Sequence, residues 1–320
     1  MDSRGLHRFL FEGLPVRGAL VRVTNGWREA LRRRATVGAF APPVRALIGE
    51  MTAAGILMQS SINFDGALIL QVHGDGPVKL AVAEVKSDLS FRATAKVVAD
   101  VADHARLADL TNVHGQGRCA ITLDAHNRLP GTQPYQGVVS LHGDQREPLD
   151  NFSAVIEHYM LQSEQLDTRM ILAANDEVAA GLLLQRMPAT GLGNLAAGRA
   201  EDQIGNHEDF NRLAHLAATL TREELLTLEA DTVLRRLFWQ EKLQRFEPLA
   251  TRFSCTCGRA RVQDMLISLG RAELDEILAE RHLVEIGCEY CGEQYHFDAV
   301  DVGGMFTPVF AHPPSSSTLQ

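Results

Sequence analysis

Two close pairs of cysteines constrain this chain more than any other feature. Of its five cysteines, four stand in Cys255-Thr256-Cys257 and Cys288-Glu289-Tyr290-Cys291. Thiolates are soft, strong zinc ligands, and four that converge make a closed tetrahedral site. Thirty residues separate the two pairs, which is enough for a small folded segment between two halves of one site. The spacing therefore predicts one zinc ion per chain, with all four of these cysteines as its ligands.

The role of that metal has two interpretations. In the first, zinc only holds a small fold together, because the last seventy or so residues are too few to build a generous core. In the second, loss of the metal is the function. Each pair is close enough to form its own disulfide, and the thiolate is the form that oxidants attack. Three arginines beside the first pair would offset the charge of four thiolates: Arg252, Arg259 and Arg261.

Composition limits the class of protein. A chain of 320 residues favours more than one domain. The net charge of −9 argues against a nucleic-acid partner, since neutralising phosphates needs clustered Lys and Arg. The charged segment 1–11 does not resemble a secretory signal, and no apolar run is long enough to cross a bilayer. We therefore expect a cytoplasmic protein without a membrane partner, whose thiols stay reduced.

Residues 1–188 are expected to form a strand-rich α+β domain with packed helices. β-branched alternation and turn residues such as Gly13-Leu14-Pro15 predict strands, and apolar residues at helical spacing predict helices. The fifth cysteine, Cys119, is predicted to be a small buried hydrophobe in a strand. The expected helices cover 27–34, 44–60 and 152–165, the last capped by Asp150, and the expected strands lie within 9–24 and at 67–72, 80–85, 89–95, 118–123, 137–141, 170–174 and 178–187.

A metastable helical linker is expected over residues 189–250. It begins with the glycine-rich stretch 190–198 and continues with three short helices at 208–220, 222–228 and 232–242. Five leucines of this linker form an apolar face that needs another surface to cover it: Leu213, Leu216, Leu220, Leu225 and Leu228. Such short helices are marginal alone. A small four-cysteine zinc and redox-switch domain at 251–306 and a disordered tail at 307–320 complete the expected organisation.

Rival functions find less support. The chain has no G-x-S-x-G, P-loop or H-E-x-x-H motif, and Asp124 with His126 reads as a turn residue and an exposed histidine. Four cysteines also saturate zinc and leave no open position for catalysis. A structural zinc ribbon that binds nucleic acid or a protein partner without redox switching is the alternative. Acidic residues around the cysteines weigh against the nucleic-acid version: Glu273, Asp275, Glu276, Glu280, Glu285, Glu289 and Glu293.

An arginine cluster near the N-terminus leaves two interpretations open. Arg28, Arg32, Arg33 and Arg34 follow one another within a single predicted helix. The cluster is either a solvated helix face or a contact surface for an acidic partner or client.

Several stretches outside and around the cysteines carry a family resemblance. They are Phe64-Asp65-Gly66, Gly74-Asp75-Gly76-Pro77, Tyr135-Gln136-Gly137-Val138-Val139, Ser163-Glu164-Gln165-Leu166, Gly181-Leu182-Leu183-Leu184-Gln185-Arg186-Met187-Pro188 and Phe253-Ser254-Cys255-Thr256-Cys257. With them, and with both cysteine spacings, the chain resembles the bacterial redox-regulated 33 kDa heat-shock chaperones, which are zinc-dependent holdases. The resemblance covers residues 8–306.

The resemblance implies an ATP-independent holdase rather than an enzyme. It implies zinc on Cys255, Cys257, Cys288 and Cys291 in the reduced, inactive protein. Oxidation would pair Cys255 with Cys257 and Cys288 with Cys291, release the metal, unfold the linker and produce an active homodimer that binds unfolded or partly unfolded proteins under oxidative stress. Spacing alone does not select this pairing, since four cysteines allow three connectivities.

Overall fold

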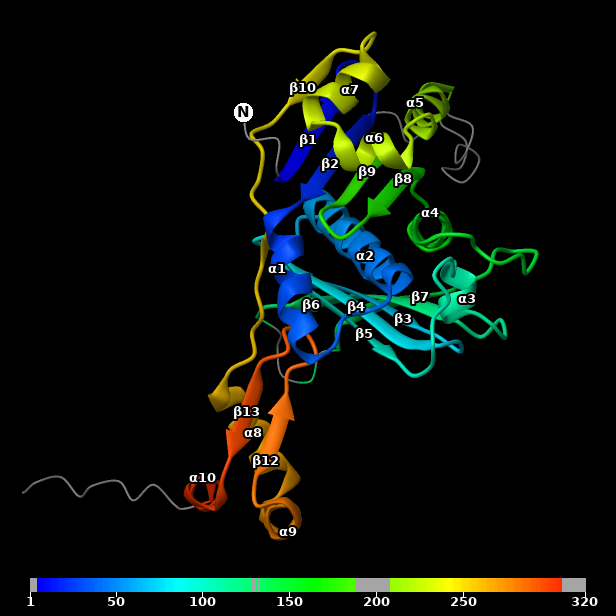
Figure 1. Ribbon diagram of the computed structural model, residues 1–320. Coiled ribbons are helices and arrows are strands. Elements are labelled where there is room, and N and C mark those ends of the chain that lie inside the picture. Colours follow the sequence, from blue (N-terminus) through cyan, green and yellow to red (C-terminus); the bar gives the residue numbers. More distant parts are fainter. Residues whose placement is uncertain (1–4, 128–130, 132, 188–207, 307–320) are drawn as a thin grey trace, which may run out of the picture. The chain divides into compact units, whose positions relative to one another are not determined.

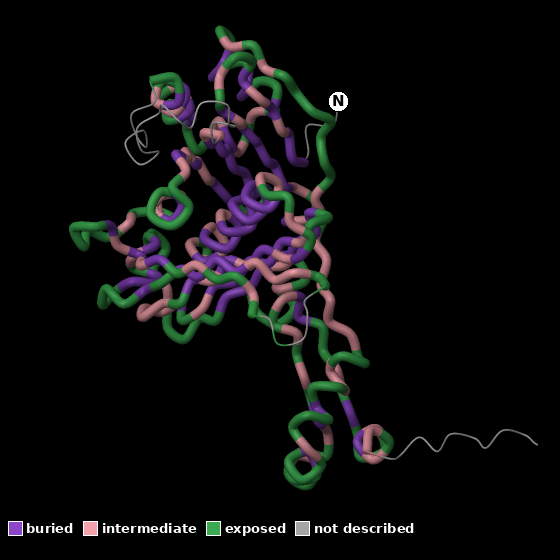
Figure 2. Tube along the Cα trace, turned by 180° about the vertical axis from the view of Figure 1, so that it is seen from behind, coloured by how far each residue is buried: buried purple, intermediate pink, exposed green. Residues whose placement is uncertain are grey.

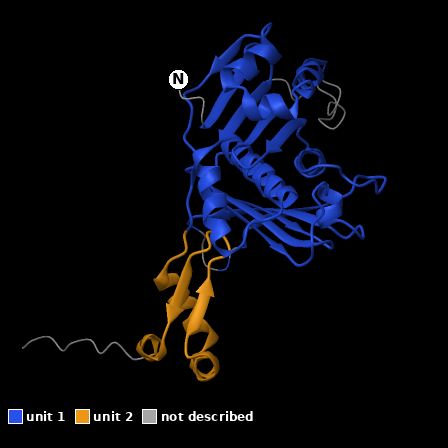
Figure 3. Ribbon diagram, viewed as in Figure 1, with its two compact units in different colours: residues 1–255 blue, residues 256–320 orange. Residues whose placement is uncertain are grey.

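The structure is a computed structural model, and it describes residues 5–127, 131, 133–187 and 208–306 (Figure 1). It divides into two compact units, Met1–Cys255 and Thr256–Gln320, here called unit 1 and unit 2 (Figure 3). The glycine-rich stretch 190–198 and the tail 307–320 of the sequence prediction lie outside the described residues.

Unit 1 contains two sheets. The first sheet is antiparallel, with strand order β10-β1-β2-β9-β8. The second has the order β11-β5-β4-β3-β6-β7 and is antiparallel except for β11, which runs parallel to β5. The bounds are β1 Gly5–Phe11, β2 Val16–Val23, β3 Gly66–His73, β4 Val78–Lys86, β5 Ser90–Val97, β6 Arg118–Ala125, β7 Tyr135–Ser140, β8 Thr168–Ala174, β9 Ala179–Arg186, β10 Leu243–Arg245 and β11 Arg252–Phe253.

A long helix, α2 (Pro42–Ser61), packs against both sheets and is buried along most of its length (Figure 2). Two glycines permit this close approach. A Cβ at Gly49 would lie 2.5 Å from the Cβ of Ala174 in the first sheet, and one at Gly55 would lie 2.8 Å from Val85 in the second. A helix buried on all sides carries no polar face, which explains its almost continuous apolar sequence.

The remaining elements of this part of unit 1 are α1 (Asn25–Arg34), the 3-10 turn η1 (Ala35–Val37), α3 (Leu107–Thr111) and α4 (Phe152–Gln162). The predicted cap of α4 is wrong by one residue, because Asn151 rather than Asp150 accepts the backbone N–H of Ala154, at 2.9 Å. The helix also ends three residues earlier than expected, and Gln165 beyond it has a φ of +54°.

Three linker helices follow, α5 (Glu208–Ala218), α6 (Arg222–Thr227) and α7 (Ala230–Phe238). Of the predicted apolar face, Leu213 and Leu225 are fully buried and Leu220 is 6% exposed. The surface that covers them is one face of the first sheet, here called the outer face. Together they form one apolar cluster, whose sheet members include Phe9, Phe11, Val16, Leu20, Leu182 and Leu184. The linker therefore folds by packing on the first sheet.

Unit 2 holds α8 (Arg259–Leu269), α9 (Arg271–Arg281), the antiparallel hairpin β12 (Val284–Gly287) and β13 (Gln294–Phe297), and α10 (Ala299–Met305). Its buried core is small and consists of Leu266, Leu274, Val284, Phe297 and Val302. None of the helices in the described part of the chain combines the length and the apolarity needed to cross a membrane.

The packing of α7 yields a first test. The Phe238 ring lies 5.1 Å from Phe11 and 6.2 Å from Phe9, whereas the next residue, Trp239, is 73% exposed. Phe238→Ala should weaken linker docking by about 3–5 kcal/mol, the usual effect of removing a buried phenyl ring. Trypsin should then cleave residues 208–245 faster, whereas Trp239→Ala should leave the rate unchanged. Equal rates for both variants would contradict the packing described.

Candidate metal centre

The four cysteines predicted to bind zinc meet at one place. The Sγ atoms of Cys255, Cys257, Cys288 and Cys291 all lie within 4.8 Å of one another, and those of Cys257 and Cys291 are 3.3 Å apart. A zinc–sulfur distance of about 2.3 Å in tetrahedral geometry separates neighbouring sulfurs by about 3.8 Å. A disulfide would require about 2.05 Å, and none of the four cysteines is in a disulfide. The donor set therefore fits a tetrahedral thiolate-bound metal.

The second pair lies in the turn of the β12–β13 hairpin. The backbone N–H of Cys288 donates to the carbonyl oxygen of Glu293, and that of Gly292 donates to Cys288, both at 2.8 Å. Gly292 has a φ of +73°, a conformation that a side chain disfavours. The tight turn brings Cys291 back beside Cys288. Cys291 is 4% exposed, the most buried thiol of the cluster.

The first pair follows a segment that is fixed to the second sheet of unit 1. The backbone N–H of Ser254 donates to Phe91 at 2.9 Å, and the Phe253 ring meets the Phe91 ring edge-on at 6.2 Å. Arg252 forms an ion pair with Asp88. Cys255 thus lies two residues after the end of an anchored strand, β11.

The three arginines near the first pair have defined partners. Arg259 pairs with Asp301 at 2.7 Å and stacks over the Phe297 ring at 4.2 Å, so it holds α8 to α10 and β13. Arg252 is matched by the Asp88 carboxylate. Arg261 donates to Thr256 Oγ1 at 3.2 Å, between the two cysteines of the first pair. Arg261 is therefore the arginine best placed to offset thiolate charge.

Tyr295 belongs to the site although the sequence reasoning missed it. A hydrogen bond to Cys257 raises the pKa of Tyr295, so its hydroxyl stays protonated and donates to sulfur. Such a donor stabilises a thiolate ligand in the way that outer-shell partners tune metal sites. The alternation of β13 could have indicated it, because Tyr295 lies within the strand that follows the second cysteine pair.

The fifth cysteine and the rejected acid–base pair lie elsewhere. Cys119 is fully buried in β6, and burial raises the pKa of its thiol to about 12, which keeps it protonated. Asp124 lies at the end of β6 and His126 is exposed in the following turn. No second group of three or more potential metal ligands occurs in the part of the chain that the structure describes.

The arginine cluster of α1 is largely engaged within unit 1. Arg32 and Arg33 both bind Glu29, at 2.9 and 2.6 Å, and lower the pKa of that carboxyl to about 2. Arg28 pairs with Glu177, and Arg34 stacks over Phe40. These contacts favour the solvated helix face over a surface kept for an acidic partner.

Comparison with known proteins agrees with this architecture. The family model for the Hsp33 protein matches residues 5–298. The 33 kDa chaperonin of Chromobacterium violaceum is 42% identical over 94% of this chain and 93% of its own length, and that of Methylobacillus flagellatus is 38% identical over 97% of each. The chain belongs to the Hsp33 family.

A solved structure supports the fold independently. The crystal structure of the 33 kDa chaperonin from Thermotoga maritima matches with a TM-score of 0.72 over 94% of this chain and 97% of that one, at 19% identity. The α+β fold with a C-terminal four-cysteine cluster is thus confirmed. As an Hsp33 protein the chain is a redox-regulated chaperone and not an enzyme.

The cluster predicts a clear difference between cysteines. Cys288→Ser should weaken zinc binding at least about tenfold, because one of four thiolate ligands is lost. Cys119→Ala removes the buried thiol of β6 and should leave one zinc per chain. Competition with a chromophoric chelator measures both affinities. Equal zinc affinity in the two variants would show that the cluster is not the metal site.

Proposed function

We propose that this protein is an ATP-independent holdase that zinc keeps inactive and oxidation activates. The observation that carries the proposal is the cluster of four thiols within 4.8 Å, none of them in a disulfide, in a chain whose linker helices cover an apolar sheet face. In the reduced protein Cys255, Cys257, Cys288 and Cys291 would hold one zinc ion. The organisation we propose is a chaperone domain at 1–188, a metastable linker at 189–250, a redox-switch domain at 251–306 and a tail at 307–320.

Oxidation would convert the four ligands into two disulfides. With hydrogen peroxide, each pair of thiolates loses two electrons to the oxidant and forms one S–S bond, while peroxide accepts those electrons and two protons from solvent and becomes two water molecules. Zinc leaves because no thiolate remains. Distances do not select the partners, since all four Sγ atoms lie within 4.8 Å of one another and those of Cys257 and Cys291, from different pairs, are 3.3 Å apart. We propose the disulfides Cys255–Cys257 and Cys288–Cys291 because the family resemblance implies them and because the two cysteines of each pair are close in sequence.

Metal loss would reach the linker through the chain itself. The core of unit 2 holds five buried apolar residues, so its folding depends on the metal. Cys255 lies two residues after the end of β11, which pairs with β5 over two residues only, Arg252 with Ser90 and Phe253 with Phe91. Nine residues before Cys255, Phe246 lies in the segment that leads back to the linker helices. Release of this short strand would leave the C-terminal end of the linker held to β1 by β10, the Leu6–Leu249 bridge and the Phe246–Arg8 backbone hydrogen bond.

The released surface is suited to unfolded proteins. If the linker helices left the first sheet, Phe9, Phe11 and Leu20 would become exposed together with the apolar faces of α5 and α7. Large exposed apolar patches are characteristic of protein-binding sites. We propose that unfolded or partly unfolded clients bind there, that the oxidised protein is a homodimer, and that it works in the cytoplasm with neither a nucleic acid nor a membrane as partner.

The direct test treats the reduced, zinc-loaded chain with hydrogen peroxide under mild heat. Released zinc, remaining thiols and aggregation of a denatured client are followed together. We expect about one zinc released per chain and client aggregation suppressed in parallel. Retained zinc, or lost zinc without client protection, would leave the alternative of a structural zinc module with no redox switch.

A second prediction concerns how the linker is held. The buried guanidinium of Arg22 in β2 donates to the carbonyl oxygens of Leu225 and Leu226 at the end of α6, at 3.1 and 3.0 Å. Arg22→Met leaves those carbonyls without their donor, which destabilises linker docking by about 1–3 kcal/mol for each buried group. The reduced, zinc-bound variant should therefore protect clients partly, as the oxidised protein does.

The control for this variant is Arg28→Ala, which removes an exposed pair with Glu177 that contributes at most about 1 kcal/mol. It should stay inactive when reduced. A folded Arg22→Met protein as inactive as this control would show that linker docking does not set the activity.

A further inference from the structure

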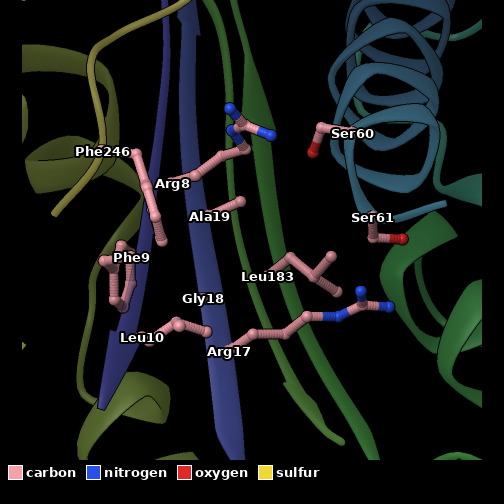
Figure 4. Close-up of a pocket in the computed structure, with 10 residues that line it drawn as sticks. All are labelled: Arg8, Phe9, Leu10, Arg17, Gly18, Ala19, Ser60, Ser61, Leu183 and Phe246. Carbon is pink, nitrogen blue, oxygen red and sulfur yellow. The ribbon is translucent and has the colours of Figure 1, made fainter. Parts of the chain in front are cut away.

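A groove runs along the inner face of the first sheet, beyond the end of α2. Two cavities of about 220 and 300 Å³ adjoin there and share Arg17 and Ser61 in their linings. The smaller is polar at one side, where Arg8 and Arg17 extend from neighbouring strands toward Ser60 and Ser61 (Figure 4). Side chains along a strand point alternately to the two faces of the sheet. Val16 belongs to the outer face, which the linker helices cover, so its neighbour Arg17 lies on the inner face.

The two arginines form an uncompensated positive site. Arg8 lies opposite Ala19 and Arg17 opposite Leu10 in the β1–β2 ladder, which makes the two guanidinium groups diagonal neighbours on one face. The Nε of Arg17 donates to the neutral Oε1 of Gln185 at 3.0 Å. Burial lowers the pKa of Arg17, which reflects the cost of holding this charge away from water.

Arg8 is less satisfied still. Its guanidinium stacks over the Phe246 ring at 5.8 Å, and its Nε is buried without a hydrogen-bond partner. Within the residues that the structure describes, neither Arg8 nor Arg17 forms an ion pair with a carboxylate. Two like charges held on one face of a sheet destabilise it unless an anion joins them.

The larger cavity extends this site with an apolar channel. Its walls come from the end of α2, the second sheet and α4, and consist mainly of aliphatic side chains: Met58, Ile62, Leu68, Ile121, Leu123, Met160 and Leu166. At its other side, Glu164 accepts hydrogen bonds from Tyr159 at 2.6 Å and Tyr135 at 3.0 Å. These hydrogen bonds hold the Glu164 carboxylate in place without neutralising it, so the larger cavity carries one negative charge and the two arginines carry the positive charge of the groove.

Three stretches that make the chain similar to its family contribute to this channel. Tyr135, Glu164 and Gln185 come from three different stretches and all line the larger cavity. The cysteine switch gives none of them a role. A ligand site would give these residues a shared function.

We propose that the groove binds an amphipathic anion, an acyl or alkyl chain that ends in a carboxylate or phosphate. Arg8 and Arg17 bind the head group, and the aliphatic channel holds the chain. An unfolded client is the less suitable occupant, because the groove opens on the face opposite the docked linker helices. A client site there would remain available in the reduced protein, whereas this protein is regulated by oxidation.

The test uses the full-length, reduced, zinc-loaded protein and titration calorimetry with decanoate, decyl phosphate, inorganic phosphate and decanol. We expect saturable binding of one decanoate or decyl phosphate per chain, and the tighter of the two identifies the head group. Arg8→Gln and Arg17→Gln should each weaken that binding at least tenfold. Arg28→Gln, a surface arginine on α1, should bind as the native chain does.

Three results would overturn the proposal. One is decanol binding as tightly as decanoate, because the arginines would then contribute nothing to binding a charged head group. Another is inorganic phosphate binding as tightly as decyl phosphate, because the channel would contribute nothing. The third is an unchanged affinity in both arginine variants, with zinc content and thermal unfolding confirming that they fold. Because the protein stays reduced throughout, the outcome is independent of the redox switch.

Discussion

The fold depends on the packing of the linker helices against the outer face of the first sheet. Helices of 11, 6 and 9 residues are marginal in water. They are stable here because fully buried leucines such as Leu213 and Leu225 each contribute about 1.5–3 kcal/mol through burial. The sheet in turn needs them, since Phe9 and Leu20 would otherwise face water. In the proposed switch, this mutual dependence would let undocking of the linker expose apolar surface on both partners.

The four-cysteine cluster is a second feature on which the structure depends. Unit 2 has little core of its own, and the thiols are close enough to bind one metal ion. N-terminal to this cluster lies β11, a strand of two residues, and the linker precedes β11 in the chain. In the proposed switch, a chemical change at sulfur would act on β11, whose strand pairing in unit 1 spans two residues only. The arginine groove lies on the opposite face of the first sheet from the linker helices, so a ligand there would bind without displacing them.

Much of this was predictable from sequence because local rules agree with the tertiary structure. Cysteine spacing identified the cluster, alternation identified most strands of unit 1, and helical periodicity identified α2 and the linker helices. The surface that covers Leu213 was not predictable, since it depends on which strands neighbour in space. β10 and β11 are too short to show alternation, and the cap of α4 was predicted at Asp150, one residue before the observed cap, Asn151. The Arg8–Arg17 groove was missed because its residues come together only through strand pairing, whereas Tyr295 was missed although its place in β13 could have indicated it.

Hydrogen exchange followed by mass spectrometry tests the central claim most directly. Reduced, zinc-loaded protein is compared with the same protein after peroxide treatment. Peptides from α5, α6 and α7 should lose their protection on oxidation, while those from α2 and the central strands β3 and β4 keep theirs. Linker helices that remain protected after zinc has left and disulfides have formed would contradict the account.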